Sequence, residues 1–107
     1  MEVLVLVAGE VIANNIAAWD GHAWHPLETG MDFMVYAVTV FNGELIAAGL
    51  FANAGGVEAN SIARWDGSAW HPLGAGMSEF GIVYALSIFD GELIAGGSFT
   101  TAGGVSA

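Results

Sequence analysis

The sequence predicts an all-β protein made of antiparallel four-stranded units, about two units in its 107 residues, with no substantial helix. Three observations predict this class. Most of the chain forms an internal repeat with an offset of 46–48 residues. Short apolar runs are joined by Asn-Gly or Asp-Gly, and no stretch has a convincing helical hydrophobic period. Asn-Gly and Asp-Gly between apolar runs favour two-residue β-hairpin turns, in which both residues adopt positive φ.

The internal repeat has two well-matched parts. Residues 16–31 align with 62–77, with twelve of sixteen identical, and residues 35–59 align with 83–107, with sixteen of twenty-five identical. A two-residue difference in length falls between Met31 and Val35 in one copy and between Met77 and Val83 in the other, which predicts a loop there. A period of this length fits four short strands, as in a β-propeller blade, better than a helical repeat.

Four strands can be placed in each unit. The first is expected over 35–41 and 83–89, and the second over 44–49 and 92–97, with the turns Asn42-Gly43 and Asp90-Gly91 between them. After a glycine-rich loop (54–56 and 102–104), the third strand is expected over 15–19 and 61–65. Asp20-Gly21 and Asp66-Gly67 then predict a second hairpin, which leads into the fourth strand around 69–71. Pro26 and Pro72 lack a backbone N–H, so the fourth strand is expected at a sheet edge.

The N-terminal residues 1–13 are interpreted as an extra strand over Val3 to Val11, in which 7–9 are compared with 47–49. They do not fit a signal peptide or a membrane span, because they have no basic start, carry Glu2 and Glu10, and are too short. The expected organisation is therefore an extra strand (1–13), a half-blade with strands three and four (14–34), a complete blade (35–82) and a half-blade with strands one and two (83–107).

The composition restricts the class of function. Hydrophobic residues make up 55% of the chain and charged residues 11%, and the strands do not alternate apolar with polar, so both faces of each sheet are expected to be buried. The net charge of −10, with Arg64 the single Lys or Arg, argues against nucleic acid and anionic membranes as partners. The acids are scattered, unlike the clustered carboxylates of a calcium loop, and no cysteine is present for disulfides or thiolate chemistry.

Several residues resemble the kelch family of β-propellers. Gly96-Gly97 matches the family's Gly-Gly doublet and Ala48-Gly49 is a weaker version, while Trp65-Asp66 and Trp19-Asp20 stand where the family usually has Tyr-Asp. Trp70 and Trp24 match the Trp that follows. The Trp-Asp-Gly and Phe-x-x-Ala-Gly-Gly variant is similar to propeller repeats of large secreted bacterial and fungal cell-surface proteins. The resemblance covers residues 14–107 and implies an extracellular or cell-surface protein that binds or scaffolds, with no single activity.

The predicted organisation has a half-blade on each side of one complete blade, and this predicts self-association. About two blades cannot close a ring of four to eight, and the C-terminal half-blade of one copy is complementary to the N-terminal half-blade of another. The expected partners are therefore copies of the chain, in a closed ring of two to four chains or an open filament. A segment of a longer array is the third alternative. The residues expected to take part in assembly are Val3, Val5, Val7, Ile16, Val83, Ala85, Leu93 and Ala95.

No constellation predicts catalysis, a cofactor or a metal. His25 and His71 occupy equivalent places, which would suit metal binding or pH sensing, but an edge-strand position beside Trp is the preferred interpretation. The serines have no His or acid partner at a repeated spacing, and the Gly-Gly pairs lack the lysine of a phosphate loop. The leading hypothesis is a non-enzymatic, self-assembling structural protein. The alternative is a carbohydrate- or protein-binding propeller module, with Trp19, Trp24, Trp65 and Trp70 as stacking platforms.

Overall fold

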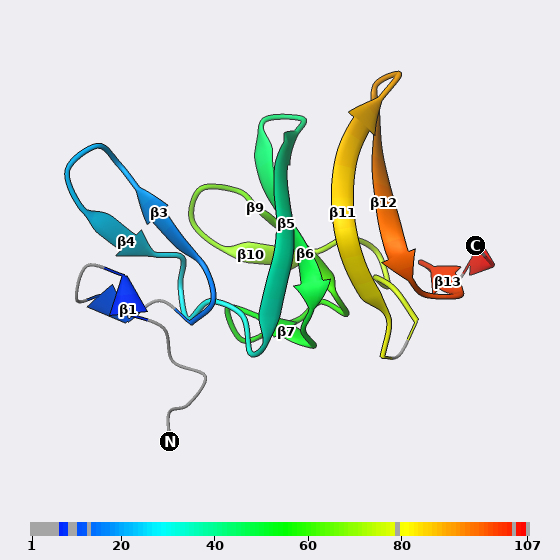
Figure 1. The fold of residues 1–107 in the computed structure, drawn as a ribbon, viewed down its shortest axis with the longest axis horizontal. Helices are drawn as coiled ribbons and strands as arrows, with labels where there is room; N and C mark the ends of the chain where they lie inside the picture. The colour runs from blue at the N-terminus through cyan, green and yellow to red at the C-terminus, as the bar shows by residue number, and fades with distance from the viewer. Residues whose placement is uncertain (1–6, 9–10, 13, 79, 104, 107) are drawn as a thin grey trace.

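The structure is a computed structural model that describes residues 7–8, 11–12, 14–78, 80–103 and 105–106 (Figure 1). Within these residues the regular elements are all β-strands, every named pair is antiparallel, and no helix occurs. The prediction of an all-β antiparallel fold is confirmed.

A four-stranded sheet lies at the centre of the molecule. It contains β5 (Met34–Phe41), β6 (Glu44–Leu50), β9 (Ile62–Trp65) and β10 (Trp70–Pro72), in the spatial order β10-β9-β6-β5. Strand β10, which ends at Pro72, is at the edge, as its proline predicts. On its inner side β10 pairs with β9 in a hairpin that sets Trp70 opposite Trp65.

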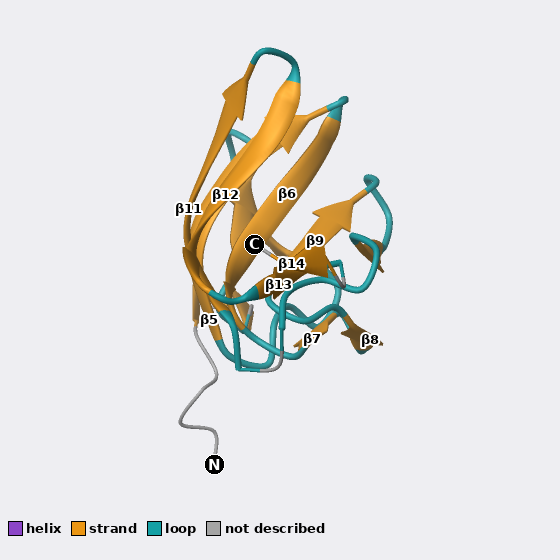
Figure 2. Cartoon of the chain, turned by 90° about the vertical axis from the view of Figure 1, so that its right-hand side faces the viewer, coloured by secondary structure: helices purple, strands orange, loops and turns teal. Residues whose placement is uncertain are grey.

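A larger hairpin lies on each side of this central sheet. Strands β3 (Ala17–Trp19) and β4 (Trp24–Pro26) form one, and β11 (Ile82–Phe89) and β12 (Glu92–Ser98) form the other (Figure 1). Strand β11 packs against β5 and β6, as the side view also shows (Figure 2). The rings of Tyr36 on β5 and Tyr84 on β11 are 5.3 Å apart between centroids. The order of elements is therefore hairpin, complete sheet, hairpin.

Three small hairpins carry the glycine-rich segments. They are β1 (Val7–Ala8) with β2 (Val11–Ile12), β7 (Asn53–Ala54) with β8 (Val57–Glu58), and β13 (Thr101–Ala102) with β14 (Val105–Ser106). The prediction of one strand over Val3 to Val11 is wrong, because Val7–Ala8 folds back on Val11–Ile12; residues 3–6 lie outside the described residues. The segment matches 53–58, at the same offset of 46 as the strands that follow, and not 47–49.

The turns explain where the strands reverse. Asn42 and Asp90 have φ of 53° and 54°, each followed by a glycine at 77°, so the predicted two-residue turns are confirmed. The Trp-Asp-Gly hairpin uses a longer turn, because Trp65 pairs directly with Trp70 and leaves four residues between them. In that turn Gly67 has φ of 104°, while Asp66 accepts hydrogen bonds instead of adopting positive φ.

Candidate functional site

Two hydrophobic cores lie on opposite faces of the central sheet. The first core is formed between the sheet and the β3–β4 hairpin. Its buried residues are Leu27, Met31, Ala47, Phe51, Ala54, Ala59, Ala63 and Trp70. The second core is formed between the sheet and the β11–β12 hairpin, and its buried residues are Ile46, Ala48, Ile62 and Val83.

Trp70 closes the first core. Its side chain is 2% exposed, and its indole Nε1 donates a hydrogen bond of 3.0 Å to the backbone carbonyl of Leu27, forty-three residues earlier in the chain. The bond joins the edge strand of the central sheet to the segment that leaves β4. A buried indole N–H needs a hydrogen-bond acceptor, and the Leu27 carbonyl provides it, so Trp70 fills the core without leaving an unpaired donor.

The second core has no such closing residue among the described residues. Leu73, Met77 and Phe99 occupy the places that Leu27, Met31 and Phe51 have in the first core, yet they are half-buried where those three are buried. By the repeat, the counterparts of Ala63 and Trp70 are Ala17 and Trp24, which lie in the β3–β4 hairpin on the far side of the sheet. Trp24 is 40% exposed. The C-terminal side of the described chain therefore has a partly exposed core, and the N-terminal side has the side chains that correspond to the missing part of that core.

The sheet edges follow the same pattern. Strand β6 is paired on both sides, with β5 and with β9. Within the described part of the chain, β12 pairs only with β11, and β3 pairs only with β4. Strand edges of this kind present backbone N–H and C=O groups to any strand that can align with them.

The structure separates the residues predicted to take part in assembly. Val83 is fully buried inside the second core, so it contributes to the packing within the chain. Leu93 and Ala95 on β12 are half-buried and pack against the same core, whereas Ala85 is exposed. Ile16 packs against the first core. Val7 lies in β1, and Val3 and Val5 lie outside the described residues.

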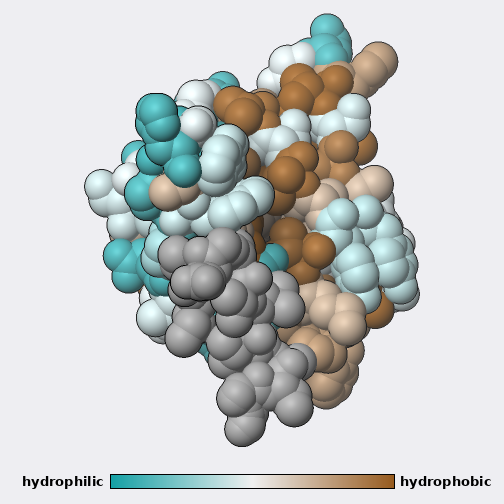
Figure 3. Space-filling view, turned by 60° about the vertical axis from the view of Figure 1, so that its left-hand side comes forward, coloured by the Kyte–Doolittle hydropathy of each residue, from teal (hydrophilic) through white to brown (hydrophobic). Residues whose placement is uncertain are grey.

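Many exposed apolar side chains belong to β5 and β11. Met34, Tyr36, Val38 and Val40 of β5 are all exposed, as are Tyr84, Ile88 and Phe89 of β11. Figure 3 shows hydrophobic side chains as a band beside a hydrophilic region. Large apolar side chains exposed along two neighbouring strands are candidates for an interaction surface.

The four tryptophans form two tilted pairs. Trp19 and Trp24 have ring centroids 5.4 Å apart, and Trp65 and Trp70 have centroids 5.2 Å apart, both with interplanar angles of 55°. Trp70 is buried and presents no open ring face, whereas Trp19 and Trp24 are exposed and Trp65 is half-buried. The rings thus pack on each other across the hairpins in both copies.

An aspartate organises each Trp-Asp-Gly turn. Oδ1 of Asp66 accepts hydrogen bonds from the backbone N–H of Ser68 (2.8 Å) and Ala69 (2.9 Å), and Oδ2 lies 2.7 Å from Nε2 of His71. Asp20 holds His22, Ala23 and His25 in the same way, with 2.5 Å to His25 Nε2. The Asp–His contact is not among the predicted features, although both copies have the same five-residue spacing.

These hydrogen bonds stabilise the ionised carboxylates. The pKa of Asp66 is lowered from 3.8 to about 2, first by the backbone N–H of Ala69 and next by the His71 side chain. The pKa of Asp20 is lowered to about 2 as well, mainly by its hydrogen bond with His25. The two histidines therefore act as partners of the turn aspartates.

This arrangement predicts a pH dependence of the turn. Because the folded-state pKa of Asp66 lies below the unfolded value of 3.8, its stabilising contribution is complete above pH 3.8 and is lost as the pH falls towards 2. In an NMR titration, we expect the amide resonances of Ser68 and Ala69 to shift with a midpoint near pH 2. Asp66→Asn should abolish that titration. A midpoint at the ordinary aspartate value in the folded protein would contradict the hydrogen-bonding pattern.

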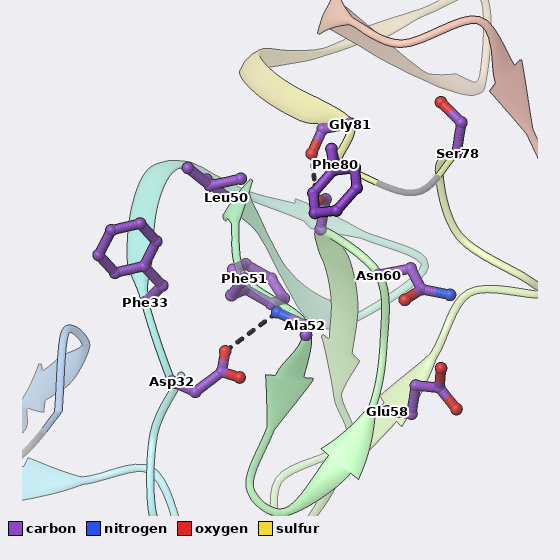
Figure 4. A pocket seen from close by; sticks show the side chains of 11 residues that line it. Asp32, Phe33, Leu50, Phe51, Ala52, Glu58, Asn60, Ser78, Phe80 and Gly81 are labelled. Atoms are coloured by element: carbon purple, nitrogen blue, oxygen red, sulfur yellow. Dashed lines mark hydrogen bonds between the residues drawn. The ribbon is translucent and has the colours of Figure 1, made fainter.

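A pocket of about 710 Å³ opens beside Phe33 and Phe51 of the first core (Figure 4). Its shape is fixed by hydrogen bonds: Ser61 Oγ donates to the Gly81 carbonyl at 2.6 Å, and Oδ1 of Asp32 accepts from the backbone N–H of Ala52 at 3.0 Å. Phe80, 86% exposed with φ of 63°, lies at the rim. The residues that line it are Asp32, Phe33, Leu50, Phe51, Ala52, Glu58, Asn60, Ser61, Ser78, Phe80 and Gly81.

One feature of the sequence lies at this pocket: the two-residue length difference between the copies, which predicts a loop, includes Phe80. Among the described residues, no group of three or more His, Cys, Asp or Glu side chains is placed to hold a metal ion. The same part of the chain has no helix that is long and apolar enough to cross a membrane. Comparisons with protein-family models, curated proteins and solved structures found no match.

Proposed function

We propose that this chain is a non-enzymatic, self-assembling structural protein whose copies associate head to tail, as a closed ring of two to four chains or as a filament of propeller-like units. One observation carries the proposal. The second core has half-buried residues where the first core has buried ones, and the side chains that would close it, Ala17 and Trp24, stand at the opposite side of the molecule.

The open edges and apolar surface support the same conclusion. An open β-strand edge next to a partly exposed core is unfavourable in water, and association with a complementary edge removes both costs. The net charge of −10 opposes association, because like charges on the copies repel each other. Added salt screens that repulsion, so association is expected to strengthen as the ionic strength rises.

The test is the mass in solution, measured by light scattering across a dilution series at low and high salt. A constant mass of two, three or four chains supports a closed ring, and a mass that grows with concentration supports a filament. Trp24→Ala should reduce the mass, while Phe80→Ala, which removes an exposed aromatic from the loop before β11 and leaves the strands β3 and β12 intact, should not. A single-chain mass at every concentration and salt level would overturn the proposal.

The pocket favours a second candidate function, a binding module for a carbohydrate or a protein partner. Phe80 and Phe33 offer aromatic faces, and the exposed carboxylate of Glu58 and the amide of Asn60 offer polar contacts. Binding in a glycan array that Phe80→Ala abolishes, with the mass in solution unchanged, would favour this function. An extracellular or cell-surface location is proposed with either function, and rests on the resemblance of the Trp-Asp-Gly repeat to secreted propellers.

A further inference from the structure

From the pairing inside the central sheet we infer how two copies join: β12 of one copy pairs with β3 of a second copy in the register that β6 and β9 use, and the small hairpins β13–β14 and β1–β2 compete for one place at that junction. This inference rests on the proposed self-association. It specifies the partner strand, the register, and a segment that has to move.

The register follows from the central sheet. There, the pairs between β6 and β9 are Leu45 with Trp65, Ile46 with Arg64, Ala47 with Ala63, and Ala48 with Ile62. The repeat offset converts these pairs into contacts between copies, which are Leu93 with Trp19, Ile94 with Ala18, Ala95 with Ala17, and Gly96 with Ile16. No side chain in this set is charged, so the pairing strands bring no charge repulsion into the sheet.

The faces of the strands agree with this register. On β6, Leu45 packs against the first core and Ile46 is buried in the second. On β12, Leu93 packs against the second core, while Ile94 points away from it and is exposed. On β3, Ala18 packs against the first core of its own copy, so the alternation of a strand directs Ala17 to the opposite face. Ala17 and Ala95 then both face the second core of the first copy.

The tryptophan completes the junction. The indole of Trp70 bonds to the carbonyl of Leu27, the residue that follows β4. The corresponding bond at the junction runs from Nε1 of Trp24 in the second copy to the carbonyl of Leu73 in the first. Docking therefore covers Leu73, Met77 and Phe99 and buries Trp24, which gives the second core the same composition as the first.

The small hairpins create a conflict at this junction. In the central unit, β7–β8 holds one place: Gly55 donates its N–H to the carbonyl of Gly30 at 2.7 Å, and β8 lies beside β10. In the first copy, β13–β14 is attached in that way, since Gly103 donates to the carbonyl of Gly76 at 2.6 Å. In the second copy, β2 already lies beside β4. Both hairpins would fill the position of β7–β8, so one of them has to be displaced for the copies to join.

Because the chain has no cysteine, disulfide trapping tests the register directly. Ala17→Cys and Ala95→Cys in one chain should give reducible cross-links between chains, since directly paired residues in an antiparallel sheet are close enough for a disulfide. The two positions lie in hairpins on opposite sides of the central sheet (Figure 1), so they cannot be joined within one chain. Ala47→Cys with Ala63→Cys is the matched control, because it repeats the same pair inside the chain.

We expect a ladder of cross-linked chains from the 17/95 pair, a cross-linked monomer from the 47/63 pair, and little product from Ala18→Cys with Ala95→Cys, which is out of register. Mixing the single variants Ala17→Cys and Ala95→Cys should stop at two chains. If light scattering shows association but the 17/95 pair gives no ladder, the register is wrong and self-assembly stands. If the 47/63 control forms and every variant remains a single chain, self-assembly itself fails.

Deleting residues 1–13 should speed the 17/95 reaction, and slower cross-linking would overturn the competition between hairpins.

Discussion

Replacing Trp70 with alanine is expected to lower the free energy of unfolding of the single chain by about 3–5 kcal/mol, the usual cost of removing a buried large aromatic from a core. The side chain is 2% exposed and fills the first core, and its indole N–H is bonded to Leu27. The alanine leaves a cavity and an unpaired carbonyl near the link between β4 and β5. Urea unfolding followed by far-UV circular dichroism measures the effect, at a concentration where light scattering shows single chains.

Trp24→Ala is the matched control, because Trp24 has the same local sequence in the other copy. Its side chain is 40% exposed and packs on Trp19, so we expect a loss of about 1 kcal/mol in the single chain, the size of an aromatic pair. Trp70→Phe removes the indole hydrogen bond but keeps an aromatic ring, so it should lower the free energy of unfolding less than Trp70→Ala does. Equal losses for Trp24→Ala and Trp70→Ala in single chains would contradict the difference in burial.

The sequence predicts the local structure of this protein well, because turn chemistry and strand patterning are local properties. Asn42-Gly43 and Asp90-Gly91 require positive φ at both residues, and they have it. Pro72 can close a strand only at an edge, and β10 is the edge. The strands of the central sheet follow the predicted ranges within about one residue, the ordinary uncertainty of element boundaries.

The sequence could not predict what depends on neighbours in space. Trp24 and Trp70 stand in nearly identical nine-residue stretches, yet one is exposed and the other buried, because only Trp70 has the Leu27 segment beside it. The Gly-Gly doublet also has unequal members: a Cβ at Gly97 would collide with the backbone of Ile82, whereas a Cβ at Gly96 would meet nothing within 4 Å. Ala48 stands at the position of Gly96 in the other copy, consistent with that freedom.

The N-terminal strand was mispredicted for a related reason. Its Val-Leu alternation favours a strand, but the spacing Ala8-Gly9-Glu10-Val11 matches Ala54-Gly55-Gly56-Val57, and that spacing specifies a tight hairpin. An alignment at a constant offset of 46 would have identified it. The difference matters for the proposed assembly, because an extra strand would add to the edge of a neighbouring copy, whereas a third small hairpin would compete with the hairpin already there.

Deleting residues 1–13 is therefore expected to strengthen self-association. In the proposed junction, docking displaces one of two hairpins, so the competent form is only a fraction of the population and the apparent dissociation constant rises by the inverse of that fraction. An isolated two-stranded hairpin is marginally stable, so we estimate that removing it lowers the concentration at half-association by about tenfold. Light scattering of the deleted and full-length chains, in the same salt, measures the shift.

A point variant and a second deletion make the result specific. Val11→Pro keeps the full length and disrupts the pairing of Val11 with Ala8, so it should act in the same direction as the deletion. Deleting residues 101–107 removes the competing hairpin from the other end and should also relieve the conflict, although it takes Ala102 away from the Met77 bridge. If residues 1–13 instead formed a strand that adds to a neighbouring sheet, both N-terminal changes would weaken association. The direction of the shift therefore decides whether this segment restrains assembly or drives it.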